Sequence, residues 1–197
     1  MITSVLMLIF AYLLGSINSA ILLAKLCHLP SPTKSGSGNP GASNMLRIGG
    51  KKLAIFTLLG DMAKGIIPVL LAKFLLLPIS TIHLIALVVV IGHMFPIFFK
   101  FKGGKGVATL FGVAFAINLY VGVILFLTWA TIAFVSRYAA VASLLVAILF
   151  PALDYLFFHN MCAMALSVLL SVFIIAKHHA NIVRLCKGKE NKLKSGR

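Results

Sequence analysis

Long apolar runs recur along this sequence and limit what it can fold into. The five runs are Ile2–Leu26, Leu53–Leu77, Thr81–Phe99, Val107–Ser136 and Ala139–Ala176. A helix needs about 20 apolar residues to cross the ~30 Å hydrocarbon core of a bilayer, and each run is long enough to supply a crossing. We therefore expect an all-α, polytopic integral membrane protein in which residues 1–197 form a single membrane domain.

The last two runs decide the number of passes, whereas the first three are expected to be single spans. Val107–Ser136 would be about 45 Å long as one helix, which is well over the bilayer core, and Asn118 lies near its middle. Ala139–Ala176 is interrupted by polar residues and a proline, so it is expected to form a pair of short helices. The interrupting residues are Pro151, Asp154, His159 and Asn160.

Positive charge gives the orientation of the chain in the membrane. If Val107–Ser136 were a single pass, Arg137 and the basic C-terminal tail would lie outside. A break near Asn118 instead places 16 of the 18 cations inside, with Lys64 and Lys73 the exceptions, as the positive-inside rule favours. The prediction is seven transmembrane helices, with the N-terminus outside and the C-terminus cytoplasmic. Val107–Ile117 is then only half a span, and it must be surrounded by other helices or lie where the membrane is thin.

This topology brings three polar, basic segments to the cytoplasmic face, namely residues 34–52, 100–106 and 177–193. The first combines glycines with neutral hydrogen-bond donors and one guanidinium group: Gly36, Gly38, Gly41, Ser37, Asn39, Ser43, Asn44 and Arg47. Glycine lets the backbone turn its N–H groups toward an anion, and arginine binds phosphate through two parallel hydrogen bonds. The segment suits a phosphate ligand at the membrane surface. The alternative is a simple turn between two spans.

The other two segments repeat this chemistry. Gly103, Gly104, Lys105 and Gly106 place a flexible backbone and one point charge directly before a helix N-terminus, where anions bind well. Lysines in a cytoplasmic loop are also expected from topology alone. In the third segment, His178 and Asn181 share one helix face. The alternative for His178 and its neighbour His179 is that they reach toward the lipid headgroups.

Acidic residues are scarce and exclude several kinds of chemistry. Asp61, Asp154 and Glu190 are the only ones, and they are too scattered for a carboxylate dyad or a magnesium site. No metal or other cofactor is therefore expected, and a net charge of +15 suits membrane lipids and phosphorylated substrates rather than nucleic acid. Asp61 and Lys64, three residues apart within a span, are expected to form a structural ion pair. A proton or substrate path is the alternative.

Three motifs occur in order along the chain: GSGNPGASNMLR, GHMFPIFFKFKGGKGVAT and HHANIVRLCKGKE. Together they resemble those of the bacterial acyl-phosphate:glycerol-3-phosphate acyltransferases, the PlsY family. Ser43 stands where that family usually has threonine. The doubled histidine is a second departure, and the family's spacing to asparagine selects His178. The resemblance implies transfer of a fatty acyl group from acyl phosphate to the 1-hydroxyl of sn-glycerol 3-phosphate. The products would be lysophosphatidic acid and inorganic phosphate, in the first committed step of phospholipid synthesis.

The resemblance also implies roles for individual residues. The expected catalytic residues are Ser37, Arg47, Lys105, His178 and Asn181, and Ser143 is expected to help orient the substrate. The acyl-phosphate group would be held by Ser37, Asn39 and Ser43 with the backbone of Gly38 and 103–106, and the glycerol phosphate would be neutralised by Arg47, Lys105 and His178. Glu190 would brace the third segment against Arg184. The expected setting is the bacterial cytoplasmic (inner) membrane, with a monomeric protein and a soluble acyl-phosphate-forming enzyme as partner.

A transporter or flippase for a phosphorylated solute or lipid is the main alternative function. It would use the same cytoplasmic anion pocket, with Asp61 and Lys64 on the translocation path. The sequence shows no inverted repeat, and the polar groups gather at one face, which favours an enzyme. Phosphatidyl transfer from a CDP-alcohol would need several aspartates and a divalent metal, and the acidic residue count argues against it.

Overall fold

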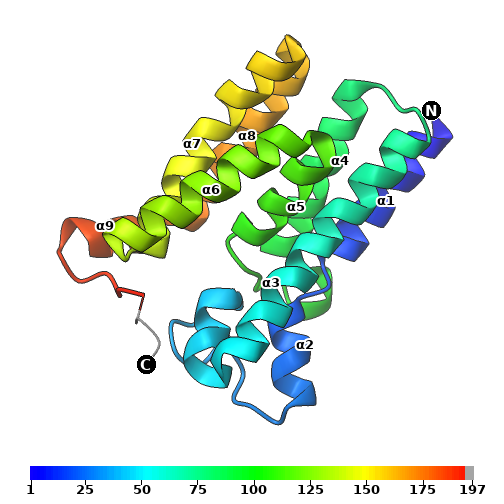
Figure 1. The fold of residues 1–197 in the computed structure, drawn as a ribbon. Helices are drawn as coiled ribbons and strands as arrows, with labels where there is room; N and C mark the ends of the chain where they lie inside the picture. Colours follow the sequence, from blue (N-terminus) through cyan, green and yellow to red (C-terminus); the bar gives the residue numbers. More distant parts are fainter. Residues whose placement is uncertain (194–197) are drawn as a thin grey trace.

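The computed structural model describes residues 1–193 and is entirely helical over that range (Figure 1). Lys194 and Arg197, which contribute to the predicted charge of the C-terminal tail, lie outside the described residues. The elements are α1 (Ile2–Gly15), α2 (Ser19–Leu26), α3 (Ala42–Phe74), α4 (Ile79–Met94), the 3-10 helix η1 (Ile97–Phe99), α5 (Val107–Ile117), α6 (Leu119–Ser136), α7 (Ala139–Phe158), α8 (Met161–Lys177) and α9 (His179–Cys186).

The helices have the lengths and apolar character of membrane spans, as predicted. Four segments are long and apolar enough to cross a membrane, namely α3, α4 together with η1 (Ile79–Phe99), α6 and α7. The number rises to six if the bent pairs α1 with α2 and α8 with α9 each count as one span, and α5 is a further, shorter apolar helix. The structure thus contains four to six candidate spans.

The first apolar run is not the single continuous helix that its composition suggested. α1 ends at Gly15, α2 begins at Ser19, and their axes differ by 43°. Asn18 causes the restart, because its side-chain oxygen accepts a hydrogen bond from the Ile21 N–H at 3.0 Å and caps α2. An N-cap inside an apolar run therefore ended one helix and began another.

The predicted break at Asn118 is confirmed. Asn118 ends α5 and caps α6, with its side-chain oxygen accepting from the N–H groups of Tyr120 at 2.9 Å and Val121 at 3.3 Å. The predicted division of the last run is also confirmed, because Asn160 caps α8 in the same way. Pro151, however, lies inside α7, so the division falls at residues 159–160.

The short helix α5 lies in the middle of the bundle, surrounded by other helices as predicted for a half-length segment (Figure 1). It packs closely on α3, where a Cβ atom added to Gly112 would lie 2.1 Å from the backbone oxygen of Met62. Its last carbonyls are satisfied by Lys73 of α3, whose Nζ donates to Ala116 O at 3.0 Å and Ile117 O at 3.3 Å. A buried short helix therefore has partners for its packing face and for its C-terminus.

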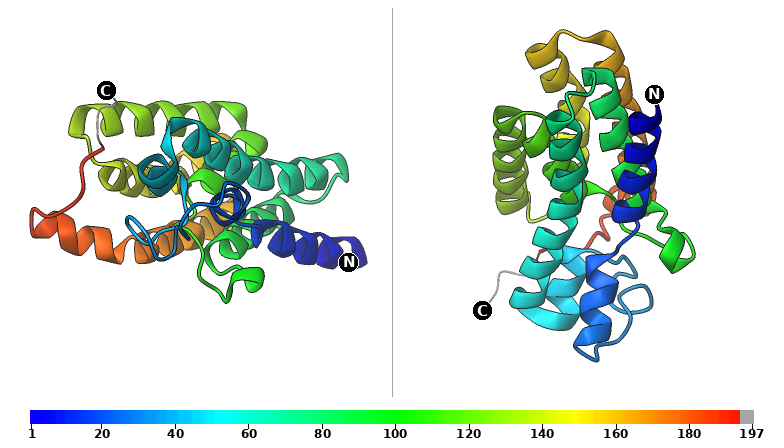
Figure 2. Two further views of the ribbon diagram at one scale, coloured as in Figure 1. Left: turned by 90° about the horizontal axis from the view of Figure 1, so that it is seen from below. Right: turned by 90° about the vertical axis from the view of Figure 1, so that its right-hand side faces the viewer.

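The polar part of the chain projects from one end of the bundle. α2, the loop after it and the start of α3 lie at the end opposite the N-terminus (Figure 2). α3 bends where this part meets the bundle, at Gly50, whose φ of 80° and ψ of −178° are not helical. A residue with a side chain is strained in that conformation, so glycine allows the bend. Asn44 and Arg47, from the first turns of α3, line the same pocket as Lys105, which follows α4, and His178, which lies between α8 and α9.

Candidate active site

One pocket gathers most of the residues that the sequence singled out. Ser37, Lys105 and His178, from three separate segments, all line it. The full set of predicted site residues in its wall is Ser37, Asn39, Gly41, Ser43, Asn44, Arg47, Asp61, Lys105, Gly106, Ser143, His178, Asn181, Arg184 and Glu190. Gly38, Gly103, Gly104 and Lys64 do not line the pocket, and they lie close to residues that do.

Four helices begin at the wall of this pocket. Gly41, Gly106 and His178 are the N-cap residues of α3, α5 and α9, and Ala139 is the first residue of α7; all four line the pocket. The first turn of a helix carries unpaired N–H groups and about half a positive charge. The backbone therefore makes this pocket attractive to anions even before any side-chain charge is counted.

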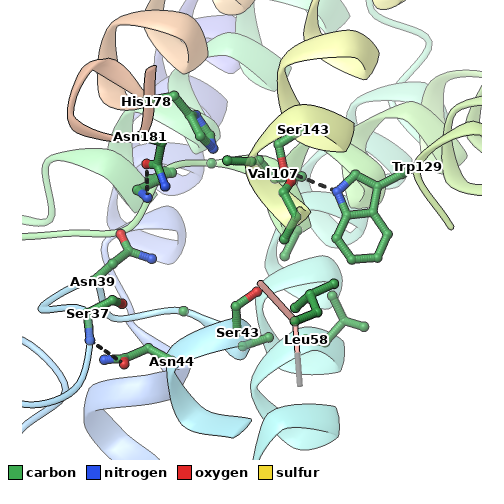
Figure 3. Close-up of a pocket in the computed structure, with 18 of the residues that line it drawn as sticks. Ser37, Asn39, Ser43, Asn44, Leu58, Val107, Trp129, Ser143, His178 and Asn181 are labelled. Carbon is green, nitrogen blue, oxygen red and sulfur yellow. Dashed lines mark hydrogen bonds between the residues drawn. The ribbon is translucent and has the colours of Figure 1, made fainter. Parts of the chain in front are cut away.

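Asn44 shapes the loop that carries Ser37. Its side-chain oxygen accepts from the Ser37 N–H at 2.8 Å, and its Nδ2 donates to Pro32 O at 2.9 Å and Ser35 O at 3.0 Å (Figure 3). The asparagine is 1% exposed. Gly36 has a φ of 63°, and a Cβ there would lie 2.1 Å from the same amide oxygen. The loop is thus wrapped around one buried side chain.

A chain of polar contacts joins the second and third segments. Lys105 Nζ donates to Asn181 Oδ1, and Asn181 Nδ2 donates to Glu190 Oε1 at 2.9 Å. Arg184 Nε donates to the other oxygen of Glu190 at 2.8 Å, so the expected contact between Glu190 and Arg184 is present. The tail that follows α9 therefore folds back onto the pocket, where it holds Asn181 against Lys105.

The electrostatics of Lys105 follow from this crowded setting. Its pKa is lowered to about 8, chiefly by burial and also by the positive charges of Arg184 and Arg47, while Glu190 opposes the shift. Without an anion in the pocket, the ammonium group is less stable than it would be in water. A bound phosphate would relieve this cost by supplying negative charge.

His178 differs from the arginines because it carries no charge at neutral pH. Burial lowers its pKa to about 4, and the nearby charge of Lys105 acts in the same direction. Its Nδ1 lies 2.8 Å from the Ile174 carbonyl oxygen, which can only accept. In the neutral ring the proton therefore sits on Nδ1, and Nε2 is left as a hydrogen-bond acceptor. The ring can receive a proton or a hydrogen bond.

An apolar wall closes the side of the pocket between α3, α5, α6 and α7. Trp129 of α6 donates from Nε1 to Ser143 Oγ at 3.1 Å, and Ser143 donates onward to Ala139 O at 2.7 Å (Figure 3). Leu58, Phe111 and Phe126 line the same side. The pocket thus has a polar end that suits phosphate and an apolar side that suits hydrocarbon.

Trp129 and His93 are among the pocket residues that were not singled out by the sequence. Trp129 is the only tryptophan in the chain, but it lies in a run in which nearly every residue is apolar. His93 belongs to the second motif, where its place before the phenylalanine–proline pair was a usable signal. The expected ion pair of Asp61 and Lys64 is present at 2.8 Å, and Asp61 reaches the pocket while Lys64 does not.

Comparison with known proteins places this arrangement in a family. The sequence model of a family described as glycerol-3-phosphate acyltransferase matches residues 5–188. A glycerol-3-phosphate acyltransferase of Francisella tularensis subsp. holarctica is 46% identical over 186 residues, which cover 94% of this chain and 91% of the relative. One of Coxiella burnetii is 44% identical over 194 residues, covering 95% of this chain and 96% of the relative.

Solved structures agree with the sequence relatives. A crystal structure of PlsY (YgiH), described as an integral membrane glycerol 3-phosphate acyltransferase in its glycerol 3-phosphate form, has a TM-score of 0.93 and 36% identity, covering 98% of this chain and 96% of that one. The lysophosphatidic acid form of PlsY has a TM-score of 0.88 and 37% identity, covering 96% and 95% of the two chains.

Proposed function

This chain belongs to the glycerol-3-phosphate acyltransferase family and is an integral membrane transferase; on that premise we propose that its acyl donor is an acyl phosphate and its product lysophosphatidic acid. One observation carries the proposal: the N-termini of α3, α5, α7 and α9 meet Arg47 and Lys105 in a single pocket that also has an apolar wall. Such a pocket suits two phosphate groups and one hydrocarbon chain. The glycerol 3-phosphate and lysophosphatidic acid forms of the similar PlsY structures support the acceptor and the product.

The two substrates bind to different parts of the pocket. Ser37, Asn39 and Ser43, with the backbone at the start of α3, hold the phosphate of the acyl donor. Arg47 and Lys105 neutralise the phosphate of glycerol 3-phosphate, and Asn181 holds the Lys105 ammonium in place. Leu58, Phe111, Phe126 and Trp129 contact the acyl chain. Asn44 and Gly38 act on the shape of the loop, since the side chain of Asn44 binds loop backbone atoms.

The reaction needs positioning more than proton chemistry. The 1-hydroxyl oxygen of glycerol 3-phosphate attacks the acyl carbonyl carbon, the bond from that carbon to the phosphate oxygen breaks, and phosphate leaves. The hydroxyl proton ends on the departing phosphate, so the products are an ester and hydrogen phosphate. Because an acyl phosphate is already activated, charge stabilisation and alignment supply the rate enhancement.

His178 contributes hydrogen bonding to this scheme rather than charge. Its Nε2 is the acceptor atom of a neutral ring, so it can hold the attacking hydroxyl group in line with the carbonyl carbon. The charge of the glycerol phosphate is then met by Arg47 and Lys105. Ser143, whose hydroxyl binds Ala139 and Trp129, sets the position of the apolar wall.

The same proposal gives the placement in the membrane. We count α5 as a seventh span beside the six that the bent pairs allow, with the N-terminus outside and the pocket at the cytoplasmic side of the inner membrane. The pocket is lined by residues from all three of the segments 34–52, 100–106 and 177–193. A soluble acyl-phosphate-forming enzyme and glycerol 3-phosphate would both reach the pocket from the cytoplasmic side. The proposed state is a monomer.

The test is a product balance on purified protein. Glycerol 3-phosphate and an acyl phosphate should yield lysophosphatidic acid and inorganic phosphate in equal amounts. The heat-inactivated protein is the control for spontaneous hydrolysis of the donor. Phosphate release without lysophosphatidic acid, or no reaction by well-folded protein, would overturn the proposal.

A further inference from the structure

A buried cluster of three ionisable side chains lies at the wall of the pocket, which Asp61 and His93 line and Lys64 does not. Asp61, Lys64 and His93 are 1%, 4% and 3% exposed, respectively. Lys64 Nζ lies 2.8 Å from Asp61 Oδ1 and donates to the Ile17 carbonyl oxygen at 2.6 Å, at the break between α1 and α2. His93 Nδ1 lies 3.7 Å from the same carboxylate oxygen. The cluster thus links α3 and α4 to the break between α1 and α2.

His93 also contacts the second polar segment, residues 100–106. Its backbone oxygen accepts from the Gly104 N–H at 3.1 Å. A Cβ added to Gly104 would lie 2.1 Å from His93 Nε2, and one added to Gly103 would lie 2.1 Å from the His93 backbone oxygen. The loop of residues 103–106 therefore lies directly on the ring and the backbone of this histidine. Lys105 follows at once and reaches Asn181.

The His93 ring lies between Asp61 and the loop. Within residues 1–193, Nδ1 of His93 is buried without a hydrogen-bond partner, and the Asp61 carboxylate oxygen faces it. One edge of the ring, at Nδ1, therefore faces Asp61 on α3, and the opposite edge, at Nε2, faces Gly104. Rotating the ring would remove the support beneath the loop.

We propose that Asp61 and His93 are positioning residues, which hold the loop of residues 103–106 so that Lys105 projects into the pocket. The proposal rests on the proposed role of Lys105 as a ligand of glycerol 3-phosphate. Neither side chain needs to touch the substrate. Their effect passes through the backbone of Gly104 to the next residue. Asp61 acts on His93, and Lys64 balances the charge of Asp61 in the membrane interior.

The helix that carries His93, α4, also supplies a residue for a matched control. His83 of α4 lies 2.9 Å from Asp154 through Nε2 and Oδ1, and both residues are buried, at 2% and 0% exposed. Neither lines the pocket. This second aspartate–histidine pair is buried like the first and is in closer contact, at 2.9 Å rather than 3.7 Å. A merely structural effect of losing such a pair should appear equally in both.

The experiment compares His93→Gln with His83→Gln in the purified full chain, measuring kcat, KM for glycerol 3-phosphate and thermal stability. His93→Gln should raise KM at least tenfold and lower kcat less than threefold. His83→Gln should lose comparable stability with KM within twofold of the parent. An unchanged KM in folded His93→Gln, or an equal rise in both variants, would refute the positioning role.

A second variant covers failure of the first to fold. Asp61→Asn alone would leave Lys64 buried and unpaired, so the double change Asp61→Asn with Lys64→Met removes both charges together. It should also raise KM at least tenfold, and a folded double variant with the parent KM contradicts the proposal. Lys105→Ala separates the two ideas. If Lys105→Ala is impaired while the cluster variants are not, the positioning role is wrong; if Lys105→Ala behaves as the parent, the proposed phosphate site is wrong.

Discussion

Lys105 is singled out by its sequence motif, by its position in the fold and by its shifted pKa. It follows two glycines in the second motif, lies one residue before the N-cap of α5 and binds Asn181 of α9. Burial and the neighbouring arginines lower its pKa to about 8, so its charge depends on pH within the physiological range. Its sequence context predicted an anion ligand, whereas the shifted pKa arises only from the packed structure.

The first prediction concerns pH. Because the lysine is charged below a pKa of about 8 and neutral above it, kcat/KM for glycerol 3-phosphate should fall as pH rises through that value. Lys105→Arg keeps its charge at every accessible pH, so its fall should move to higher pH even if its maximum is lower. The measurement is the pH profile of kcat/KM for both proteins. Superimposable profiles would show that the decline has another origin.

The second prediction concerns Arg47. Removing this guanidinium should cost at least about 2 kcal/mol of transition-state stabilisation, a loss of roughly thirtyfold or more in kcat/KM, because one charged partner of phosphate disappears. Lys52→Ala is the matched control, since this cation lies on the same helix, is exposed and does not line the pocket. Steady-state kinetics of both variants provide the comparison. Equal losses would point to general surface charge rather than to a specific contact.

At the scale of elements, a break between two helices was predictable where a capping residue lies within an apolar run that is too long for one span. Asn118 interrupts a run too long for one span, and it became the C-cap of α5 and the N-cap of α6. Asn18 carries the same capping chemistry, but its run has the length of an ordinary span, so the break between α1 and α2 was missed. The length of this run gave no sign of a break, although the N-cap at Asn18 produces one.

The short helix α5 gives the third prediction. Lys73→Met removes the donor to the last carbonyls of α5, leaving buried acceptors unsatisfied at an expected cost of about 1–3 kcal/mol. The thermal unfolding midpoint in detergent should fall, and KM for both substrates should stay unchanged, because Lys73 does not line the pocket. Lys25→Met, at an exposed position of α2, is the control. An unfolding midpoint equal to that of the control would show that α5 does not depend on this cap.

The fourth prediction concerns the close contact between α5 and α3. A Cβ at Gly112 would lie 2.1 Å from the Met62 backbone oxygen, and backbone cannot move aside as a flexible side chain can. Gly112→Ala should therefore separate the two helices and lower stability by about 1–3 kcal/mol, the usual range for overpacking. Thermal unfolding measures the change. A variant as stable as the parent would mean that the helices can shift at little cost.

At the scale of the whole molecule, the three polar segments were identified from sequence, and the structure brings residues of all three into one pocket. The convergence of four helix N-termini could not be predicted, because it depends on how α3, α5, α7 and α9 are oriented in space. The apolar wall was hidden for a different reason: Trp129 and Phe126 lie among many apolar residues that face lipid. Packing alone distinguishes those two from their neighbours.

The account depends most on the chemistry of the acyl donor. Purified protein is given glycerol 3-phosphate with equal concentrations of an acyl phosphate, an acyl-coenzyme A or an acyl thioester of acyl-carrier protein, and lysophosphatidic acid is measured. We expect product only with the acyl phosphate, because the proposed donor site holds a phosphate group that is bonded through oxygen to the acyl carbon. Lysophosphatidic acid formed at comparable rates from either thioester would contradict the account.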